Sequence, residues 1–452
     1  MNSFSLLVFG CQMNVQDGDR LRTHLLGRGM AELPPEEADL VLLVTCSIRA
    51  KAEDKVLSLL GRLDRRFRSR GRPAVVVAGC MAQRMGASLF SRFSCVRALL
   101  SPRLLGRVED LLESLASGER LLLLHEGRDE LFEISCPPLA RENPVRAYLT
   151  VAHGCDNFCT YCVVPYVRGS FRSRPPEAVL EEAKALLSSG ARLLCLVGQN
   201  VTAYGRDLGV SFEGLLLSVS SLEGPFWLSF TTCHPRDTSP RLFEAMAESP
   251  RAMRAINLPV QSGSDEVLRR MGRGYTREDF LRLVRLFRST LGEMACATSD
   301  VIVGFPGETE EDFERTLDLL ERAQLDMVHS AAFSPRPGTA AARMEGELPE
   351  EVKRRRLNEL NALQRSISLR RNRAYVGREV VVLLEEMAPK GGGRLQGRTH
   401  TDKPVVVEGD PGALGRFALV AVRRAGSFTL YGDIIRLVED EELEELRYGT
   451  IV

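Results

Sequence analysis

Between residues 144 and 372, strand-like and helix-like segments alternate six times. Short apolar runs lie near 146–152, 191–197, 225–231, 255–260, 296–303 and 327–333, each followed by helical periodicity or by a loop with glycine or proline. Parallel strands need long, usually helical crossovers, so this order indicates an α/β fold with a parallel sheet. Six such units predict a central partial (β/α)6 barrel whose working face lies at the carboxyl ends of the strands.

Three cysteines occupy the loop that follows the first of these strands. Cys155, Cys159 and Cys162 are separated by three and two residues. This spacing is typical of a tight group of thiolates that holds an iron–sulfur cluster. A cube of four irons with three cysteine ligands has one iron without a protein ligand, and such an open position can bind a substrate or cofactor. We therefore expect a reactive metal centre at this rim.

A zinc knuckle and a disulfide are the alternatives for this group. Structural zinc sites need four ligands, usually as two pairs, and no second pair lies within about twenty residues. The sequence shows no secretory signal and no apolar span of membrane length, so we expect a reducing, cytoplasmic location and no membrane. Eleven cysteines in that setting indicate metal ligation by some of them.

Residues 1–120 are predicted to form an open α/β domain with a second group of three thiols. Strand-like runs at 4–9, 39–44 and 74–78 each lead into a cysteine, namely Cys11, Cys46 and Cys80. Ligands of open α/β sheets bind outside the carboxyl ends of the strands, so these thiols should converge. The alternative is three unrelated, inert core cysteines. The remaining cysteines share no spacing and are expected to be core or incidental thiols: Cys95, Cys136, Cys195, Cys233 and Cys296.

The loops at the other strand ends of the barrel carry small, amide and hydroxyl residues. Singly, each loop is more typical of an ordinary turn, and the prediction depends on all of them facing one side. Such a rim suits a polar cofactor with nucleoside and amino acid character. The candidate cofactor-binding residues in these loops are Gln199, Asn200, His234, Gln261, Ser262, Gly304 and Glu308.

The carboxyl-terminal region is built differently. Five short strand-like runs at 379–385, 396–399, 405–407, 417–422 and 429–435 predict a small β-barrel over residues 373–439, of the kind that grips nucleic acid. The net charge is zero, with 60 basic and 60 acidic residues, so any RNA must be held by local patches. A linker is expected at 121–143 and a solvent-exposed acidic tail at 440–452. The basic helix-patterned stretch 353–373 could be an RNA contact or a solvated face.

Several of these motifs resemble known families. The Cys155, Cys159 and Cys162 group with Tyr161 resembles the motif of radical S-adenosylmethionine enzymes, which adds Tyr161 to the cofactor-binding candidates. Together with the cysteines at the three amino-terminal strand ends, it resembles the methylthiotransferase family. Segments 9–14, 154–169 and 258–264 resemble the branch of that family that modifies prenylated adenosine in tRNA. Two positions depart from the family pattern: Val44 stands where asparagine is usual, and Cys233 where serine is usual.

Segment 397–409 resembles a TRAM domain, an RNA-binding module. The resemblance implies that Arg394, Arg398, His400 and Lys403 contact tRNA phosphates. It also implies two 4Fe–4S clusters, one on each group of three cysteines, with S-adenosylmethionine bound at the cluster on the barrel. The second, auxiliary cluster on Cys11, Cys46 and Cys80 would carry the sulfur that is inserted.

The implied activity is methylthiolation at carbon 2 of N6-isopentenyladenosine beside the anticodon. That carbon carries an unactivated C–H bond, which acid, base or nucleophilic side chains cannot break, so a radical cofactor is needed. An electron donor such as flavodoxin or ferredoxin and a monomeric state are also expected. One alternative is methylthiolation of threonylcarbamoyladenosine in tRNA or of a ribosomal-protein aspartate. Another is a non-catalytic iron–sulfur protein that binds RNA as a redox sensor.

Overall fold

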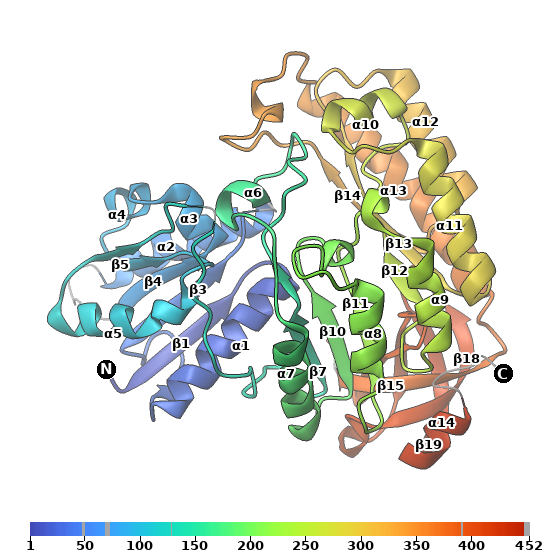
Figure 1. The fold of residues 1–452 in the computed structure, drawn as a ribbon, viewed down its shortest axis with the longest axis horizontal. Coiled ribbons are helices and arrows are strands. Elements are labelled where there is room, and N and C mark those ends of the chain that lie inside the picture. The colour runs from blue at the N-terminus through green and yellow to red at the C-terminus, as the bar shows by residue number, and fades with distance from the viewer. Residues whose placement is uncertain (48–49, 68–72, 128, 390–391, 447–452) are drawn as a thin grey trace.

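The computed structural model describes all residues except 48–49, 68–72, 128, 390–391 and 447–452 (Figure 1). An amino-terminal α/β domain lies beside a central barrel, and a small β-barrel lies below the central one. This order matches the three-part architecture predicted from the sequence. Within the described residues, no helix has both the length and the apolar character needed to cross a lipid bilayer.

The amino-terminal domain is a six-stranded parallel sheet with the order β2-β1-β3-β4-β5-β6. Helices α1 and α5 cover one face, and α2, α3 and α4 cover the other. The strands are β1 (Ser3–Val8), β2 (Ala31–Glu32), β3 (Leu40–Thr45), β4 (Ala74–Gly79), β5 (Val96–Leu100) and β6 (Leu121–Leu123). The helices are α1 (Gln12–Gly27), α2 (Ala50–Phe67), α3 (Cys80–Met85), α4 (Ser88–Arg92) and α5 (Val108–Ser117).

The three strands predicted for this domain form the centre of its sheet. β3 is buried at all six positions, which is why its sequence, Leu-Val-Leu-Leu-Val-Thr, lacks the alternation of a half-exposed strand. The last strand, β6, occupies residues that we expected in the linker 121–143. It pairs in parallel with β5, so the domain extends past residue 120.

The central barrel has the six predicted parallel strands, arranged as two three-stranded sheets, β11-β10-β7 and β12-β13-β14. A bridge between Leu228 and Ala252 joins them into one curved wall. The strands are β7 (Arg146–Thr150), β10 (Leu193–Val197), β11 (Trp227–Phe230), β12 (Ala255–Asn257), β13 (Cys296–Val303) and β14 (Met327–Ala332). The helices are α7 (Pro176–Ser188), α8 (Phe212–Ser220), α9 (Pro240–Glu248), α10 (Asp265–Met271), α11 (Arg277–Leu291), α12 (Glu310–Ala323) and α13 (Glu350–Arg373).

Helix α1 of the amino-terminal domain lies against β7, the strand at one edge of this wall. Buried polar groups hold the two domains together. Arg20 on α1 forms an ion pair with Glu182 on α7 at 2.8 Å, and Arg174 pairs with the same carboxylate at 2.7 Å. A carboxylate shared by two buried guanidinium groups fixes one relative orientation, because any other leaves charges unpaired.

The carboxyl-terminal barrel is closed, with the order β15-β16-β17-β19-β18. Its strands are β15 (Glu379–Met387), β16 (Arg394–Thr399), β17 (Pro404–Glu408), β18 (Phe417–Ala425) and β19 (Leu430–Val438). All five were predicted. The acidic tail is not fully exposed as we expected: helix α14 (Asp440–Glu445) buries Leu443 against this barrel, while residues 447–452 lie outside the described part of the chain.

The basic stretch that includes helix α13 is largely occupied by contacts within the protein. Arg356 pairs with Glu308 at 2.7 Å and Arg371 pairs with Asp326 at 3.1 Å. Arg370, which is more exposed, pairs with Glu321 at 3.1 Å. These ion pairs hold helix α13 against the central barrel. They favour a structural role for the basic stretch over contact with RNA.

Candidate active site between the two domains

The amino-terminal thiols meet at one edge of the sheet. Cys46 and Cys80 directly follow β3 and β4, and Cys11 lies three residues beyond the end of β1; these three strands are neighbours in the sheet. Glycine permits their close approach: a Cβ atom on Gly10 would lie 2.5 Å from that of Cys46, and one on Gly79 would lie 2.4 Å from the carbonyl oxygen of residue 45. Both glycines have positive φ. The hydrogen bond with Cys46 lowers the pKa of Cys11 to about 6.

The barrel thiols lie in a loop whose two ends are held together. Strands β8 (Ala152–His153) and β9 (Arg172–Ser173) pair in antiparallel fashion, and short helix α6 (Val164–Val167) lies between them. The amide of Cys155 donates to Gly169, at 3.2 Å, and that of Cys162 to Cys159, at 2.9 Å. Burial raises the pKa of Cys155 to about 11 and that of Cys162 to about 12.

Both groups of thiols border one cavity of about 550 Å³. Five of the six thiols line it, and Cys80 lies behind the other two of its group. Soft thiolates in threes suit iron–sulfur clusters. Among the described residues, no three His, Cys, Asp or Glu side chains lie close enough together to hold a single metal ion. The donor set thus fits two clusters that face a common space.

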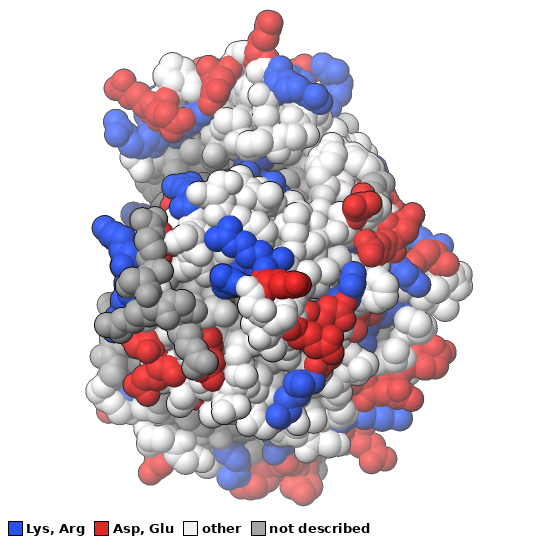
Figure 2. Space-filling view, turned by 90° about the vertical axis from the view of Figure 1, so that its left-hand side faces the viewer, with Lys and Arg blue, Asp and Glu red and all other residues white. Residues whose placement is uncertain are grey.

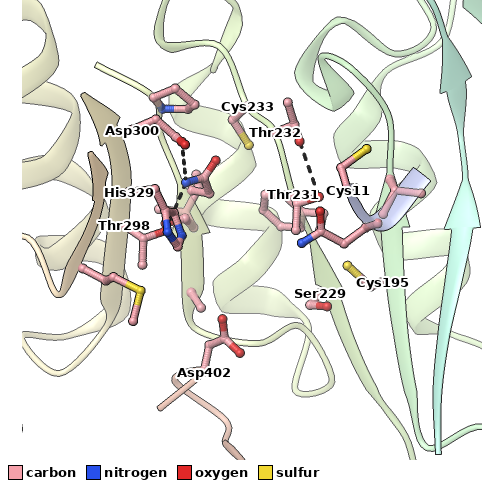
Figure 3. A pocket seen from close by; sticks show the side chains of 18 of the residues that line it. Cys11, Cys195, Ser229, Thr231, Thr232, Cys233, Thr298, Asp300, His329 and Asp402 are labelled. Carbon is pink, nitrogen blue, oxygen red and sulfur yellow. Dashed lines mark hydrogen bonds between the residues drawn. The ribbon is translucent and has the colours of Figure 1, made fainter. Parts of the chain in front are cut away.

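Polar groups of the barrel rim also enter this cavity (Figure 3). Tyr161, Gln199, His234 and Gln261 line it. The imidazole Nδ1 of His234 accepts from the amide of Arg236 at 3.3 Å, so its proton is on Nε2. Within the described part of the chain, that Nε2 and the Oε1 of Gln199 are buried without a hydrogen-bond partner. Unpaired buried polar atoms at a cavity wall fit a polar ligand that would satisfy them.

Backbone strain is also gathered at this rim. Gln261 and Thr232, which both line the cavity, have φ of 73° and 69°. Phe158, inside the cysteine loop, has φ of 44°. Left-handed backbone is uncommon for residues other than glycine and is typical of functional sites, where the surrounding structure enforces it.

Four of the predicted cofactor-binding residues do not line the cavity. The side-chain amide of Asn200 donates to Asp237 at 2.6 Å, and the hydroxyl of Ser262 is fully buried behind the rim. Glu308 accepts from the amide of Gly304, at 2.6 Å, and from Arg356. These residues have partners within the protein or are buried, and the contact of Asn200, Ser262, Gly304 and Glu308 with the cofactor stays a prediction.

The sequence analysis missed the polar floor of the cavity. Asn257, Thr298, Asp300 and His329 point into it from β12, β13 and β14 (Figure 3). The amide of Asn257 donates to the hydroxyl of Thr298 and to the carboxylate of Asp300, each at 3.2 Å. Thr298, Ser299 and Asp300 are three consecutive polar residues in the otherwise apolar strand β13. This polar run was a detectable signal, because polar side chains in such a strand must face solvent or an internal space, or bond inside the core.

Two buried arginines beside the thiols were also missed as site residues. Arg168 donates from Nε to the Sγ of Cys80 at 3.3 Å. Arg273 donates from Nη1 to the Sγ of Cys159 at 3.4 Å and from Nη2 to the carbonyl of Pro259 at 2.6 Å. Each group of thiols therefore has a guanidinium in contact with it.

The predicted phosphate-binding residues lie mostly inside the protein. Lys403 forms an ion pair with Asp326 at 2.7 Å, and Arg398 pairs with Glu385 and Asp402. His400 packs edge-on against Trp227, and burial lowers its pKa to about 3. Lys403, through Asp326, and His400, through Trp227, join the small barrel to the central one, while Arg398 pairs within the small barrel. Arg398 and Lys403 also line the cavity, and the phosphate contacts predicted for these three residues stay a prediction. Arg394, at the start of β16, is partly exposed and stays a candidate.

Charges of both signs are interspersed on the face shown in Figure 2. This agrees with the zero net charge of the chain. The described residues of this face therefore form no broad basic surface that would attract RNA. We expect RNA to be held by local contacts near the cavity.

Comparison with known proteins assigns all three parts. The Radical SAM superfamily matches residues 149–320, the uncharacterized protein family UPF0004 residues 3–101, and the TRAM domain residues 373–435. The tRNA-2-methylthio-N(6)-dimethylallyladenosine synthase of Aquifex aeolicus is 40% identical over 96% of this chain and 99% of its own length. That of Moorella thermoacetica is 40% identical over 96% and 98%.

Among solved structures, the radical S-adenosylmethionine methyltransferase TsrM from Kitasatospora setae has a similar fold. Its TM-score is 0.53 with 16% identity, over 76% of this chain and 77% of that chain. At this identity, the similarity concerns the fold alone.

Proposed function

The chain belongs to the family of tRNA-2-methylthio-N(6)-dimethylallyladenosine synthases, and we propose how its residues divide the reaction of that family. It is a tRNA methylthiotransferase of the radical SAM type, which adds sulfur and a methyl group at carbon 2 of N6-isopentenyladenosine beside the anticodon. One observation carries the proposed division: thiols from both domains line the same cavity.

Cys155, Cys159 and Cys162 would hold the first 4Fe–4S cluster, and Cys11, Cys46 and Cys80 the auxiliary one. When bound, a reduced cluster and S-adenosylmethionine together supply the carbon-centred radical that an unactivated C–H bond requires. The protein contributes position and exclusion of water. Domain docking through Arg20 and Glu182 keeps the two groups of thiols facing each other across the cavity.

The rim residues would bind S-adenosylmethionine. Burial lowers the pKa of His234 to about 3, and nearby Arg273 adds to this effect, so the imidazole is neutral at physiological pH. With Nδ1 occupied as an acceptor, Nε2–H is a donor aimed into the cavity. A carboxylate is a suitable partner, while Gln199 offers an acceptor to the amino group of the same ligand.

Replacing His234 by phenylalanine should weaken S-adenosylmethionine binding about fivefold. Phenylalanine keeps the ring contact with Tyr275 but removes the donor, which is worth about 1 kcal/mol. Equilibrium dialysis of the anaerobically reconstituted enzyme measures the change. Ser262→Ala is the matched control, because Ser262 lies behind the rim. Equal weakening in both variants would assign His234 a purely structural role.

For tRNA we propose contact with aromatic residues beside the cysteine loop. Phe158 and Tyr166 are 46% and 52% exposed, with ring centroids 6.1 Å apart. They flank Asn157 and Val164, which line the cavity. Unpaired bases of an RNA loop stack on such aromatic side chains. Arg394 would add a phosphate contact on the small barrel.

Other partners are proposed on chemical grounds. A flavodoxin- or ferredoxin-type donor would supply the electron, because the cluster on the barrel cysteines must be reduced at a low potential. We also propose that the enzyme works as a monomer in the cytoplasm. All eleven cysteines are free thiols, as a reducing compartment would keep them.

The substrate choice is tested with tRNA that carries or lacks the prenyl group. We expect the methylthio product on prenylated tRNA and at least about tenfold less on unprenylated tRNA, since a lost apolar contact of this size is worth a few kcal/mol. Mass spectrometry of digested tRNA measures the product. Product on unprenylated or threonylcarbamoylated tRNA alone, or on a ribosomal-protein aspartate, would overturn this substrate assignment.

A further inference from the structure

Arg168 connects the barrel domain to the amino-terminal thiols. It immediately follows α6, which lies between the two domains (Figure 1). Val163 and Val167 of this segment pack against Cys80. The guanidinium of Arg168 donates to the sulfur of Cys80 at 3.3 Å and to the carboxylate of Asp17 at 3.0 Å. One domain thus places a cation on a thiol of the other.

This guanidinium is held firmly and out of water. Arg168 is 4% exposed, and its carbonyl accepts from the Nη1 of Arg103 at 2.5 Å. Burial of a cation is costly unless anions surround it. Cys80 and Asp17 are the partners of its guanidinium, at 3.3 and 3.0 Å. The sulfur of Cys80 therefore lies in hydrogen-bond contact with a buried cation.

We propose that Arg168 is a positioning residue of the auxiliary cluster, whose N–H···S hydrogen bond raises the reduction potential of a cluster held by Cys11, Cys46 and Cys80. This inference rests on the proposed function, in which those cysteines hold a cluster. Hydrogen bonds to the ligand sulfurs and nearby charge are the means by which a protein tunes such a centre. A buried cation stabilises the added electron.

The electron balance of the reaction explains why a raised reduction potential at the auxiliary cluster would help. Hydrogen-atom removal leaves one unpaired electron on carbon 2 of the adenine, and the methylthiolate sulfur brings an electron pair. The new C–S bond uses two of these three electrons, so the third must pass to an acceptor. A cluster held by Cys11, Cys46 and Cys80 would supply this one-electron acceptor, and the guanidinium of Arg168 at Cys80 would favour the uptake of the electron.

The same contact makes the auxiliary site depend on domain docking. Arg168 lies six residues beyond Cys162 in the loop that carries the first group of thiols. Arg273, the guanidinium at the other group, comes from the same domain as its thiol, Cys159. The reduction potential of the auxiliary cluster is therefore raised only when the amino-terminal domain is docked on the barrel.

The test uses full-length protein with Cys155, Cys159 and Cys162 replaced by alanine, so that only the auxiliary cluster can form. Its midpoint potential is measured by an anaerobic redox titration followed by EPR. In this background we compare Asp17→Asn with the pair Asp17→Asn and Arg168→Gln. Neutralising Asp17 first means that removal of the guanidinium leaves no unpaired buried carboxylate.

We expect Asp17→Asn to shift the midpoint to a more positive potential and the added Arg168→Gln to shift it back to a more negative one. When Arg168→Lys is added to Asp17→Asn, the midpoint potential should lie between those two values, because lysine keeps the charge but not the planar geometry of the donor. Arg288→Gln is the matched control: Arg288 is a buried arginine on α11 of the central barrel, away from the domain interface, and it donates to the carbonyl of Ala323 at 2.7 Å. Its midpoint should not move.

Equal midpoints for Asp17→Asn and its Arg168→Gln pair, at equal iron content, would overturn the role of Arg168 and leave the cluster assignment intact. Absence of iron from the background protein itself would instead overturn the proposed function. Loss of iron from the Arg168→Gln pair alone would assign Arg168 a structural role in holding the cluster and would likewise overturn its role in setting the potential.

Discussion

Cys159→Ala is expected to abolish cleavage of S-adenosylmethionine. Cys159 is the buried middle member of the barrel thiols, and Arg273 donates to its sulfur. Loss of a direct ligand should cost more than loss of an outer partner, which typically reduces activity by about 10–100-fold, so we expect a fall of more than about 100-fold. The measurement is 5'-deoxyadenosine formed under dithionite by the reconstituted protein.

Cys195→Ala is the control for this variant. Cys195 is also a buried free thiol that lines the cavity, but it lies in β10 and belongs to neither group of three. Its replacement should leave the rate of S-adenosylmethionine cleavage within about twofold of the parent enzyme, because it only slightly changes the volume of one side chain in the cavity wall. Cleavage that survives Cys159→Ala would show that the barrel thiols do not hold the cluster that reduces S-adenosylmethionine.

Cys46→Ala should separate radical formation from sulfur insertion. Cys46 belongs to the amino-terminal group and is buried between Cys11 and the end of β4. Its loss removes a ligand of the sulfur-carrying centre without touching the barrel loop. We expect 5'-deoxyadenosine formation within a few-fold of the parent and methylthiolated tRNA reduced by more than about 100-fold.

Cys95→Ala controls for the stability of the amino-terminal domain, because Cys95 is buried in the core of the same sheet. It should retain both products. Equal loss of 5'-deoxyadenosine and of methylthiolated tRNA in Cys46→Ala would count against two separable centres.

Strands and ligands were predictable from the sequence because each has a local pattern. The six barrel strands are apolar runs with regular spacing, and each of the six cysteines follows a strand end. The strands β2, β5 and β6 were not predicted. β5 is an apolar run of five residues that leads into no cysteine, whereas β2 and β6 are two and three residues long and are defined by their neighbours in the sheet. Such short edge strands carry no periodicity of their own.

The side on which a rim residue lies could not be predicted. His234 and Asn200 stand at equivalent strand ends, yet one faces the cavity and the other is turned toward Asp237. Likewise, the sequence did not predict that Lys403 forms a buried ion pair with Asp326, which comes from a different domain. An ion pair between domains depends on how the domains dock. The sequence around either partner does not indicate that arrangement.

Iron and acid-labile sulfide per chain, measured after anaerobic reconstitution, test the central claim most directly. Two 4Fe–4S centres predict about eight irons per chain, and about four when either group of three cysteines is replaced by alanine. Four irons in the parent protein, or complete loss of iron on replacing one group, would contradict two clusters that share one cavity.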